Sequence, residues 1–317
     1  MIVGLAGGVG GAKLLQGLAL ARPEGELTAI VNTADDFDLF GLRICPDLDT
    51  VLYTLAGLAN PVTGWGIAGD TRATLDAITR LGRDPWFVLG DQDLATHILR
   101  TERLRSGALL STVIAEFTAA LSVQTTILPM TNEQVATIVS TPAGRLEFQE
   151  YFVHRRQEDH VLGVEFQGVK EALPAPGVLD ALASAELIVL CPSNPIVSIG
   201  PILAVPGIRD ALAYSPAPTV AVSPIVGGKA LKGPADKMMA TLGHDVSANG
   251  VSAMYQGLVD GIVIDQQDSA LAEQIGVLGQ RVLVTQTIMG DASDRQRLAS
   301  EVIQFGRSLV PAGRTAT

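Results

Sequence analysis

Basic residues are scarce in this chain, and they form no run. Its 317 residues include 22 Lys and Arg against 33 Asp and Glu, which gives a net charge of −11. A chain of this charge lacks the basic surface that nucleic acids require, so we predict no nucleic-acid partner. It could still bind a nucleotide, provided that backbone amides and a metal ion supply the attraction for the phosphates.

Cysteines and long apolar runs are also scarce. Cys45 and Cys191 lie far apart without metal-ligand spacing, which indicates two buried thiols in a cytoplasmic protein. The N-terminus lacks the features of a signal peptide, and no apolar run approaches the roughly 20 residues that cross a bilayer. We therefore predict a soluble, cytoplasmic protein without a membrane partner.

Aromatic residues make up only 4 % of the chain, although 47 % of it is hydrophobic. A core built from Ala, Leu, Val and Ile is typical of parallel sheets covered by helices. No Ser/His/Asp or Cys/His arrangement is recognisable in the sequence. Its absence argues against covalent nucleophilic catalysis.

Short apolar segments recur along the chain and predict a buried parallel sheet. Residues 2–6 form the first, followed by a glycine-rich turn, a helix and a second strand at 26–31. Later segments lie at 186–191, 219–222, 261–264 and 281–284. The pattern predicts an α/β fold, in which a doubly wound Rossmann-like parallel sheet carries an inserted, mainly helical subdomain. We expect one nucleotide-binding domain, 1–317, with the insertion at about 64–175.

Finer elements are predicted from local patterns. Residues 70–120 are mostly helical in pattern, whereas 123–128 and 147–152 read as strands of the smaller subdomain. A helix over 51–58 would be capped by Asp49 or Thr50.

The glycine-rich turn Gly7–Gly11 is the first candidate binding element. It is not a Walker A loop, because Lys13 follows Ala12 and precedes Leu14, and Lys13 also stands where the dinucleotide fingerprint needs its third Gly. A tight turn without a ligand is the alternative. Five glycines exceed what a turn requires, so we predict phosphate binding by Gly8, Gly10, Gly11 and Lys13.

Four carboxylates follow closely behind this turn. Asp35 and Asp36 end the run that begins at Asn32, and Asp47 and Asp49 come shortly afterwards. Each alone could be a helix cap or a solvated loop residue. Grouped at the carboxyl edge of a parallel sheet, they indicate a Mg²⁺ site that shares its ion with phosphate oxygens.

Two loops in the second half follow adjacent predicted strands and have similar chemistry. The first contains Ser193, Asn194, Pro195 and Ser198; the second contains Ser223, Pro224, Gly227 and Gly228. Ordinary turn chemistry explains Pro and Gly but not two matched cases. Loops at the ends of adjacent parallel strands form a crevice that binds nucleotides, so we assign both loops to the nucleotide. His97, one helical turn from Asp93, is interpreted as a cap or salt-bridge partner.

Six stretches together resemble the 2-phospho-L-lactate transferases, over nearly the whole chain. These stretches are 7–13, 32–36, 45–50, 64–67, 192–195 and 223–228. The resemblance implies transfer of a phospho-lactyl or phospho-enolpyruvyl group from a GDP-activated donor. The acceptor would be the ribityl hydroxyl of 7,8-didemethyl-8-hydroxy-5-deazariboflavin, with release of GMP, in the biosynthesis of coenzyme F420. It also implies a homodimer. Whether the donor carries a lactyl, enolpyruvyl or glyceryl group stays open.

The resemblance also implies roles for residues. Asp36 and Asp49 would be catalytic and would bind Mg²⁺. The acceptor would contact Asp35, Asp49, Trp65, Val88 and Asp91. The family often has a basic residue at the position of Val88 or Gln92, and neither is basic here.

Two other functions compete with this interpretation. A non-catalytic, nucleotide-sugar-binding regulator of the gluconeogenesis-factor type would share the glycine turn, but should not need the segment Asp47–Asp49. A nicotinamide-dependent oxidoreductase would explain a glycine turn followed by acids, but the third Gly and an evident proton donor are missing. The presence of both acidic motifs favours the transferase.

Overall fold

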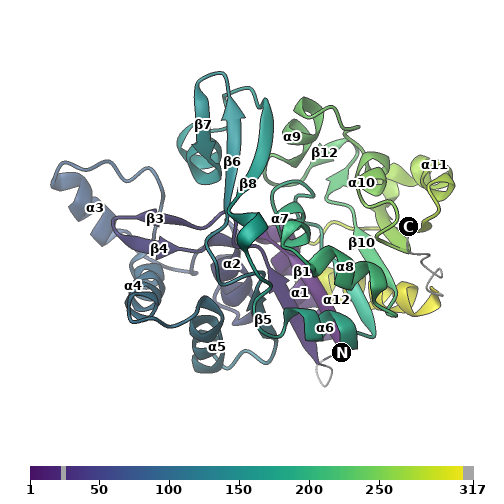
Figure 1. Cartoon of the computed structure of the whole chain (residues 1–317), viewed down its shortest axis with the longest axis horizontal. Coiled ribbons are helices and arrows are strands. Elements are labelled where there is room, and N and C mark those ends of the chain that lie inside the picture. The colour runs from purple at the N-terminus through teal and green to yellow at the C-terminus, as the bar shows by residue number, and fades with distance from the viewer. Residues whose placement is uncertain (23–25, 310–317) are drawn as a thin grey trace.

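A seven-stranded parallel sheet forms the centre of the molecule (Figure 1). The computed structural model describes residues 1–22 and 26–309. The strand order is β14-β13-β10-β9-β1-β2-β5, and every neighbouring pair is parallel. The strands are β1 (Ile2–Ala6), β2 (Leu27–Val31), β5 (Thr126–Pro129), β9 (Leu187–Leu190), β10 (Thr219–Val222), β13 (Gly261–Asp265) and β14 (Arg281–Thr285). The predicted doubly wound α/β class is confirmed.

Helices cover both faces of the sheet because successive strand residues point to opposite sides. One face packs α1 (Gly8–Ala21), α2 (Pro46–Leu55), α5 (Leu110–Ala120) and α12 (Ala292–Ser308). The other face packs α6 (Val178–Ser184), α7 (Ile199–Ala204), α8 (Ile208–Tyr214), α9 (Ala235–Thr241), α10 (Ala248–Met254) and α11 (Ala272–Val277). In β1, Ile2 and Ala6 face the first layer, while Val3 and Leu5 face the second.

Two smaller units project from the sheet's carboxyl edge. The hairpin of β3 (Phe37–Leu39) and β4 (Leu42–Ile44) packs with α3 (Ala73–Arg80) and α4 (Asp91–Arg105) around a third apolar cluster. A separate antiparallel sheet contains β6 (Ala136–Thr141), β7 (Gly144–Glu147) and β8 (Gly163–Gln167). Short elements complete the chain: the π-helix η1 (Glu150–His154), the 3₁₀ helices η2 (Val169–Glu171) and η3 (Gln266–Leu271), and the hairpin β11 (Ile225–Val226) with β12 (Lys229–Ala230).

The predicted insertion contains a strand of the central sheet. β5 lies inside 64–175, yet it pairs with β2 in parallel, from Thr28 opposite Thr126 to Val31 opposite Pro129. Predicting 123–128 as part of a separate subdomain was therefore wrong. In the sequence, the helical segments of the predicted insertion precede β5, and the antiparallel sheet follows it.

Two further predictions of local structure were wrong. The strand predicted over 147–152 was wrong beyond Glu147, which ends β7, because Phe148 and Tyr151 both enter the core and Phe148 stacks on Phe152, which are helical spacings. The helix predicted over 51–58 begins at Pro46, so Asp49 and Thr50 lie inside α2 and do not cap it. Pro at the first helical position and acidic residues in the first turn favour this earlier start.

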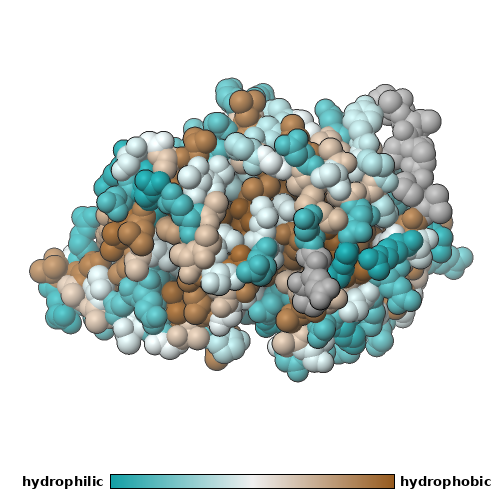
Figure 2. All heavy atoms as spheres, turned by 90° about the horizontal axis from the view of Figure 1, so that it is seen from below, coloured by the Kyte–Doolittle hydropathy of each residue, from teal (hydrophilic) through white to brown (hydrophobic). Residues whose placement is uncertain are grey.

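The molecular surface seen from below mixes hydrophilic and hydrophobic side chains (Figure 2). Across the described residues, no helix combines the length and the apolar character that a bilayer span requires.

Candidate active site

The order of the strands in the sheet places a crevice between β1 and β9. From β1 the strands continue through β2 to β5 on one side, and from β9 through β10 and β13 to β14 on the other. Open α/β sheets bind ligands at the carboxyl ends of the strands where the order reverses in this way. The glycine turn leaves β1 at that point, and the loop 191–198 leaves β9 beside it.

Hydrogen bonds join these two loops directly. The Gly7 amide donates to the Ser193 hydroxyl at 3.0 Å, and this hydroxyl donates to the Gly7 carbonyl at 2.8 Å. A Cβ on Gly10 would overlap the carbonyl oxygen of Pro192, so only glycine allows this approach. Ser193 therefore positions the turn, and its hydroxyl is already engaged within the protein.

A cavity of about 520 Å³ lies in this crevice. Its polar lining includes the glycine turn and the carboxylates of Asp35, Asp47, Asp49 and Asp93. Its lining is also apolar and aromatic, with contributions from Ile44, Trp65, Phe87, Val88, Leu89, Phe148, Phe152 and Val153. The rings of Phe148 and Phe152 stack with centroids 5.4 Å apart. The cavity can therefore accept a ligand with an anionic half and a flat apolar half.

Asn32 holds two carboxylates together behind the glycine turn. Its side-chain amide donates to Asp35 at 3.1 Å and to Asp47 at 2.9 Å. The other oxygen of Asp47 accepts the Gly8 amide at 2.8 Å. Burial raises the pKa of Asp35 well above its ordinary value, and the neighbouring Asp47 raises it further. Burial also raises the pKa of Asp47 to about 6, against the hydrogen bonds from Asn32 and Gly8. A cation would relieve this destabilisation.

Asp49 is paired with a buried arginine from α4. Nη1 of Arg100 donates to Asp49 at 3.1 Å, and Nη2 donates to the second carboxylate oxygen. Nη1 also approaches Nδ1 of His97 at 3.3 Å. Because arginine only donates, Nδ1 of His97 must accept, which leaves the proton on Nε2. Nε2 lies 3.2 Å from Asp93, which also accepts the Tyr53 hydroxyl at 2.7 Å.

Asp36 lies behind this network and does not line the cavity. Its carboxylate is 3.9 Å from the Arg43 guanidinium, and the residue is buried. Burial raises the pKa of Asp36 to about 7, although the positive charge of Arg43 opposes this.

The structure brings many of the predicted site residues together. Those that line the cavity are Gly8, Gly10, Asp35, Asp49, Trp65, Val88, Ser193, Asn194, Ser198 and Pro224. Gly11, Asp36, Pro195, Ser223 and Gly228 belong to the same loops but lie outside the lining.

Three other predicted residues make contacts away from the cavity. Lys13 donates to the Met289 carbonyl at 2.8 Å, and the Gly227 amide donates to Asp268. Asp91 accepts the amides of Ala73 and Thr74 at 3.0 and 2.9 Å, and so ties the start of α4 to the start of α3. These contacts give each of the three residues a structural role.

Sequence reasoning missed the most buried part of the site. Arg100 was not singled out, and Tyr53 and Asn32 were given no role. A signal existed on α4, where Asp93, His97 and Arg100 follow one another at helical spacing on one face. His97 was interpreted as a cap or salt-bridge partner of Asp93, and its Nε2 does lie 3.2 Å from that carboxylate, although with Nδ1 as an acceptor the ring is neutral and the contact is not an ion pair.

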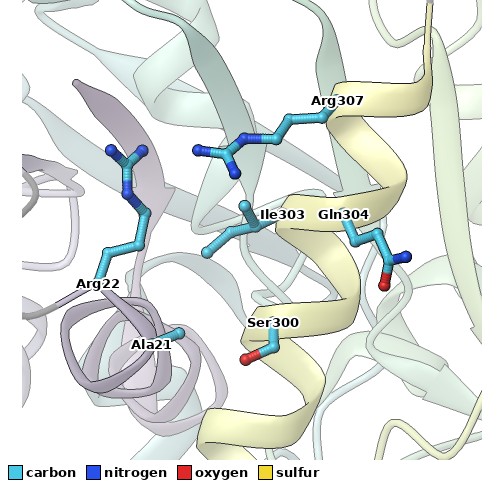
Figure 3. Close-up of a pocket in the computed structure, with 6 residues that line it drawn as sticks. All are labelled: Ala21, Arg22, Ser300, Ile303, Gln304 and Arg307. Atoms are coloured by element: carbon cyan, nitrogen blue, oxygen red, sulfur yellow. The ribbon is translucent and has the colours of Figure 1, made fainter.

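A second cavity, of about 270 Å³, lies between the end of α1 and α12 (Figure 3). Arg307 extends from α12 toward Arg22, which pairs with Glu186. None of the predicted site residues lines this cavity.

The sheet and the crevice define an α/β protein with a cavity at a strand-order reversal, the place where open α/β sheets bind ligands. A solved structure of a UPF0052-family protein from Bacillus halodurans shares this fold, with a TM-score of 0.65 and 17 % identity over 95 % of this chain and 98 % of that one.

Sequence comparisons place the chain more narrowly. The model of the family described as 2-phospho-L-lactate transferase CofD matches residues 2–312, and the chain belongs to this family of transferases. A phosphoenolpyruvate transferase of Streptomyces griseus is 42 % identical over 97 % of this chain and 99 % of its own length. A 2-phospho-L-lactate transferase of Methanothermobacter thermautotrophicus is 43 % identical over 94 % of this chain and 96 % of its own length.

Proposed function

We propose that this chain joins a phospho-lactyl or phospho-enolpyruvyl group to the ribityl hydroxyl of 7,8-didemethyl-8-hydroxy-5-deazariboflavin, in coenzyme F420 biosynthesis. The donor would be the corresponding GDP-activated acid, and GMP would leave. One observation carries the proposal: a single cavity is lined both by the glycine turn with four carboxylates and by a set of apolar and aromatic side chains. The glycine turn and the carboxylates would suit a diphosphate with its metal ion, and the aromatic side chains would suit a flat deazaflavin ring.

The chemistry is an in-line substitution at phosphorus. The acceptor's hydroxyl oxygen forms a new P–O bond, the bond to the bridging oxygen of GMP breaks, and the hydroxyl loses its proton. Such reactions depend mainly on positioning and charge neutralisation. Asp49 lines the cavity and its carboxylate is fixed by Arg100, so it would orient the attacking hydroxyl by accepting its hydrogen bond.

Mg²⁺ fits this cavity, and we assign it to Asp35 and Asp47. Both carboxylates line the cavity beside the glycine turn, and one oxygen of Asp35 has no hydrogen-bond partner among the described residues. Asp49, expected as a ligand together with Asp36, is instead paired with the positive charge of Arg100, whereas Asp47 accepts only the neutral donors of Gly8 and Asn32. Asp49, Asp93 and His97 offer ligand atoms within 4.8 Å of one another, but the same guanidinium competes with any cation there. When bound, Mg²⁺ would neutralise charge on the diphosphate.

The nucleoside half would lie along the loops after β9 and β10. Asn194, Ser198 and Pro224 line the cavity on that side. The Asn194 side-chain oxygen accepts the Ile196 amide at 2.9 Å, which fixes the orientation of its amide.

Binding measurements test the proposal against the regulator alternative. The purified protein would be titrated with the deazaflavin, and separately with GDP in the presence and absence of Mg²⁺. Saturable binding of both, with Mg²⁺ strengthening the binding of GDP, is expected. Binding of nucleotides or nucleotide sugars without affinity for the deazaflavin would favour the regulator.

A further inference from the structure

One lysine lines the cavity, whose acidic side chains are all aspartates. Among the described residues that line it, Lys232 alone is a lysine or arginine, against four aspartates. It lies in the loop between β12 and α9, and the next three residues, 233–235, line the cavity with it. Lys232 is exposed, so its side chain takes no part in the packing of the core.

Lys232 bridges two loops that come from distant parts of the chain. Nζ donates to the Thr63 carbonyl at 2.7 Å. The loop that follows Thr63 rests on the glycine turn: a Cβ on Gly64 would lie 2.6 Å from the Val9 side chain and 3.2 Å from Nζ of Lys232. The ammonium group of Lys232 therefore lies near Val9, which in the sequence stands between the cavity-lining residues Gly8 and Gly10.

This ammonium group has capacity for a further acceptor. A lysine carries three N–H donors, and within residues 1–22 and 26–309 the structure assigns one of them, to Thr63. A phosphate oxygen could thus be bound without loss of the loop bridge. The N-terminus of the 14-residue helix α1 directs its positive dipole to the same place, where the Gly8 amide already donates to Asp47.

We propose that Lys232 binds the diphosphate of the nucleotide donor and, by keeping its bond to Thr63, fastens the loops 60–66 and 231–235 over it. This rests on the proposed function, because it takes the diphosphate to be the anion at the glycine turn. Without Lys232, only Mg²⁺ and backbone amides would offset the repulsion between the diphosphate and the carboxylates of Asp35 and Asp47.

The variant Lys232→Met tests this by titration with Mg²⁺ and GDP, with Mg²⁺ and guanosine, and with the deazaflavin. Loss of a charge-assisted hydrogen bond to phosphate should weaken GDP binding about tenfold or more. Guanosine and deazaflavin should bind as they do to the wild type. Lys229→Met removes an exposed lysine of β12, just before this loop and outside the cavity lining, and should leave all three affinities unchanged.

The outcomes separate this proposal from the one on which it rests. If Lys232→Met binds GDP as tightly as the wild type, Lys232 does not recognise phosphate. The same conclusion follows if its affinity for guanosine falls as much as its affinity for GDP. If the wild type binds deazaflavin but not GDP, both proposals fail at the donor. If it binds GDP but not deazaflavin, the proposed function fails, while the comparison of variants still decides the role of Lys232.

Discussion

Asp49 and Arg100 form a buried ion pair between α2 and α4. Arg100 is 0 % exposed and Asp49 is 5 % exposed. Taking two charges out of water costs several kcal/mol for each ion, and this cost is offset only when both partners are present. The pair therefore fixes a carboxylate at the cavity wall, but each partner depends on the other.

Arg100→Met should destabilise the fold by about 3–5 kcal/mol, because it leaves the Asp49 carboxylate buried without its partner. Chemical denaturation with urea would measure the change in the free energy of unfolding. Arg103→Met is the matched control on the same helix, because Arg103 pairs with Glu116 at the surface, where solvent screens the pair, and the substitution should change stability little. Equal effects of the two substitutions would contradict the buried-pair account.

The raised pKa of Asp36 predicts how the stability of the fold depends on pH. Burial raises its pKa to about 7 in the folded state, above the ordinary value of 3.8. The folded state therefore favours the protonated form, so the contribution of Asp36 is complete below about pH 3.8 and is lost as the pH rises through 7. Asp36→Asn, which stays neutral, should gain stability relative to the wild type over this range, by up to about 4 kcal/mol at pH 8. Unfolding of the variant and the wild type in EDTA, at pH 5 and at pH 8, would measure this gain in stability. If the difference in stability between the two proteins does not grow with pH, it does not come from the titration of Asp36.

At the scale of the elements, the glycine turn and the loop after β9 meet because their strands are neighbours. Gly10→Ala places a Cβ against the Pro192 carbonyl, so the turn or the loop must shift. We expect a loss of about 1–3 kcal/mol of stability together with weaker GDP binding. Gly276→Ala, in α11, has open space around its Cβ and should be neutral or slightly stabilising. Calorimetric melting and GDP titration of both variants check this, and full GDP affinity in Gly10→Ala would exclude the turn from the site.

The central strands could be predicted because buried parallel strands are short, continuous apolar segments with turn residues on either side. β5 was misplaced because a strand at a sheet edge looks the same in sequence whichever sheet it joins. The start of α2 was misplaced because aspartates favour both caps and first turns, and Pro46 was not weighed as a first helical residue.

The site could be predicted only as far as strand order determines it. Parallel strands bring Gly8, Asp35 and Ser193 to one edge, whatever the helices do. The positions of Arg100 and Lys232 depend on how α4 and the β12–α9 loop pack, which no periodicity reports. The acceptor contact of Asp91, implied by the family resemblance, stays a prediction; its carboxylate accepts two amides at the start of α3, which no pattern in the sequence indicates.

At the scale of the whole molecule, the comparisons leave the donor open. Relatives named for phosphoenolpyruvate and for 2-phospho-L-lactate are equally similar, at 42 and 43 % identity. Lactyl and enolpyruvyl groups differ by a few atoms, and overall similarity does not report on so small a difference.

A homodimer is implied by the family resemblance and stays a prediction. One chain has a mass of 33.1 kDa. Light scattering coupled to size-exclusion chromatography should therefore return about twice this value, whereas the mass of a single chain would contradict the dimer.

Turnover is the most direct test of the central claim. The protein would be incubated with Mg²⁺, the deazaflavin and the GDP-activated lactyl, enolpyruvyl or glyceryl donor, each in a separate reaction, and products would be identified by mass spectrometry. We predict that at least one donor yields the deazaflavin phosphodiester and an equal amount of GMP, and that EDTA stops the reaction. Tight binding of GDP and deazaflavin without product from any of the three donors would contradict the account.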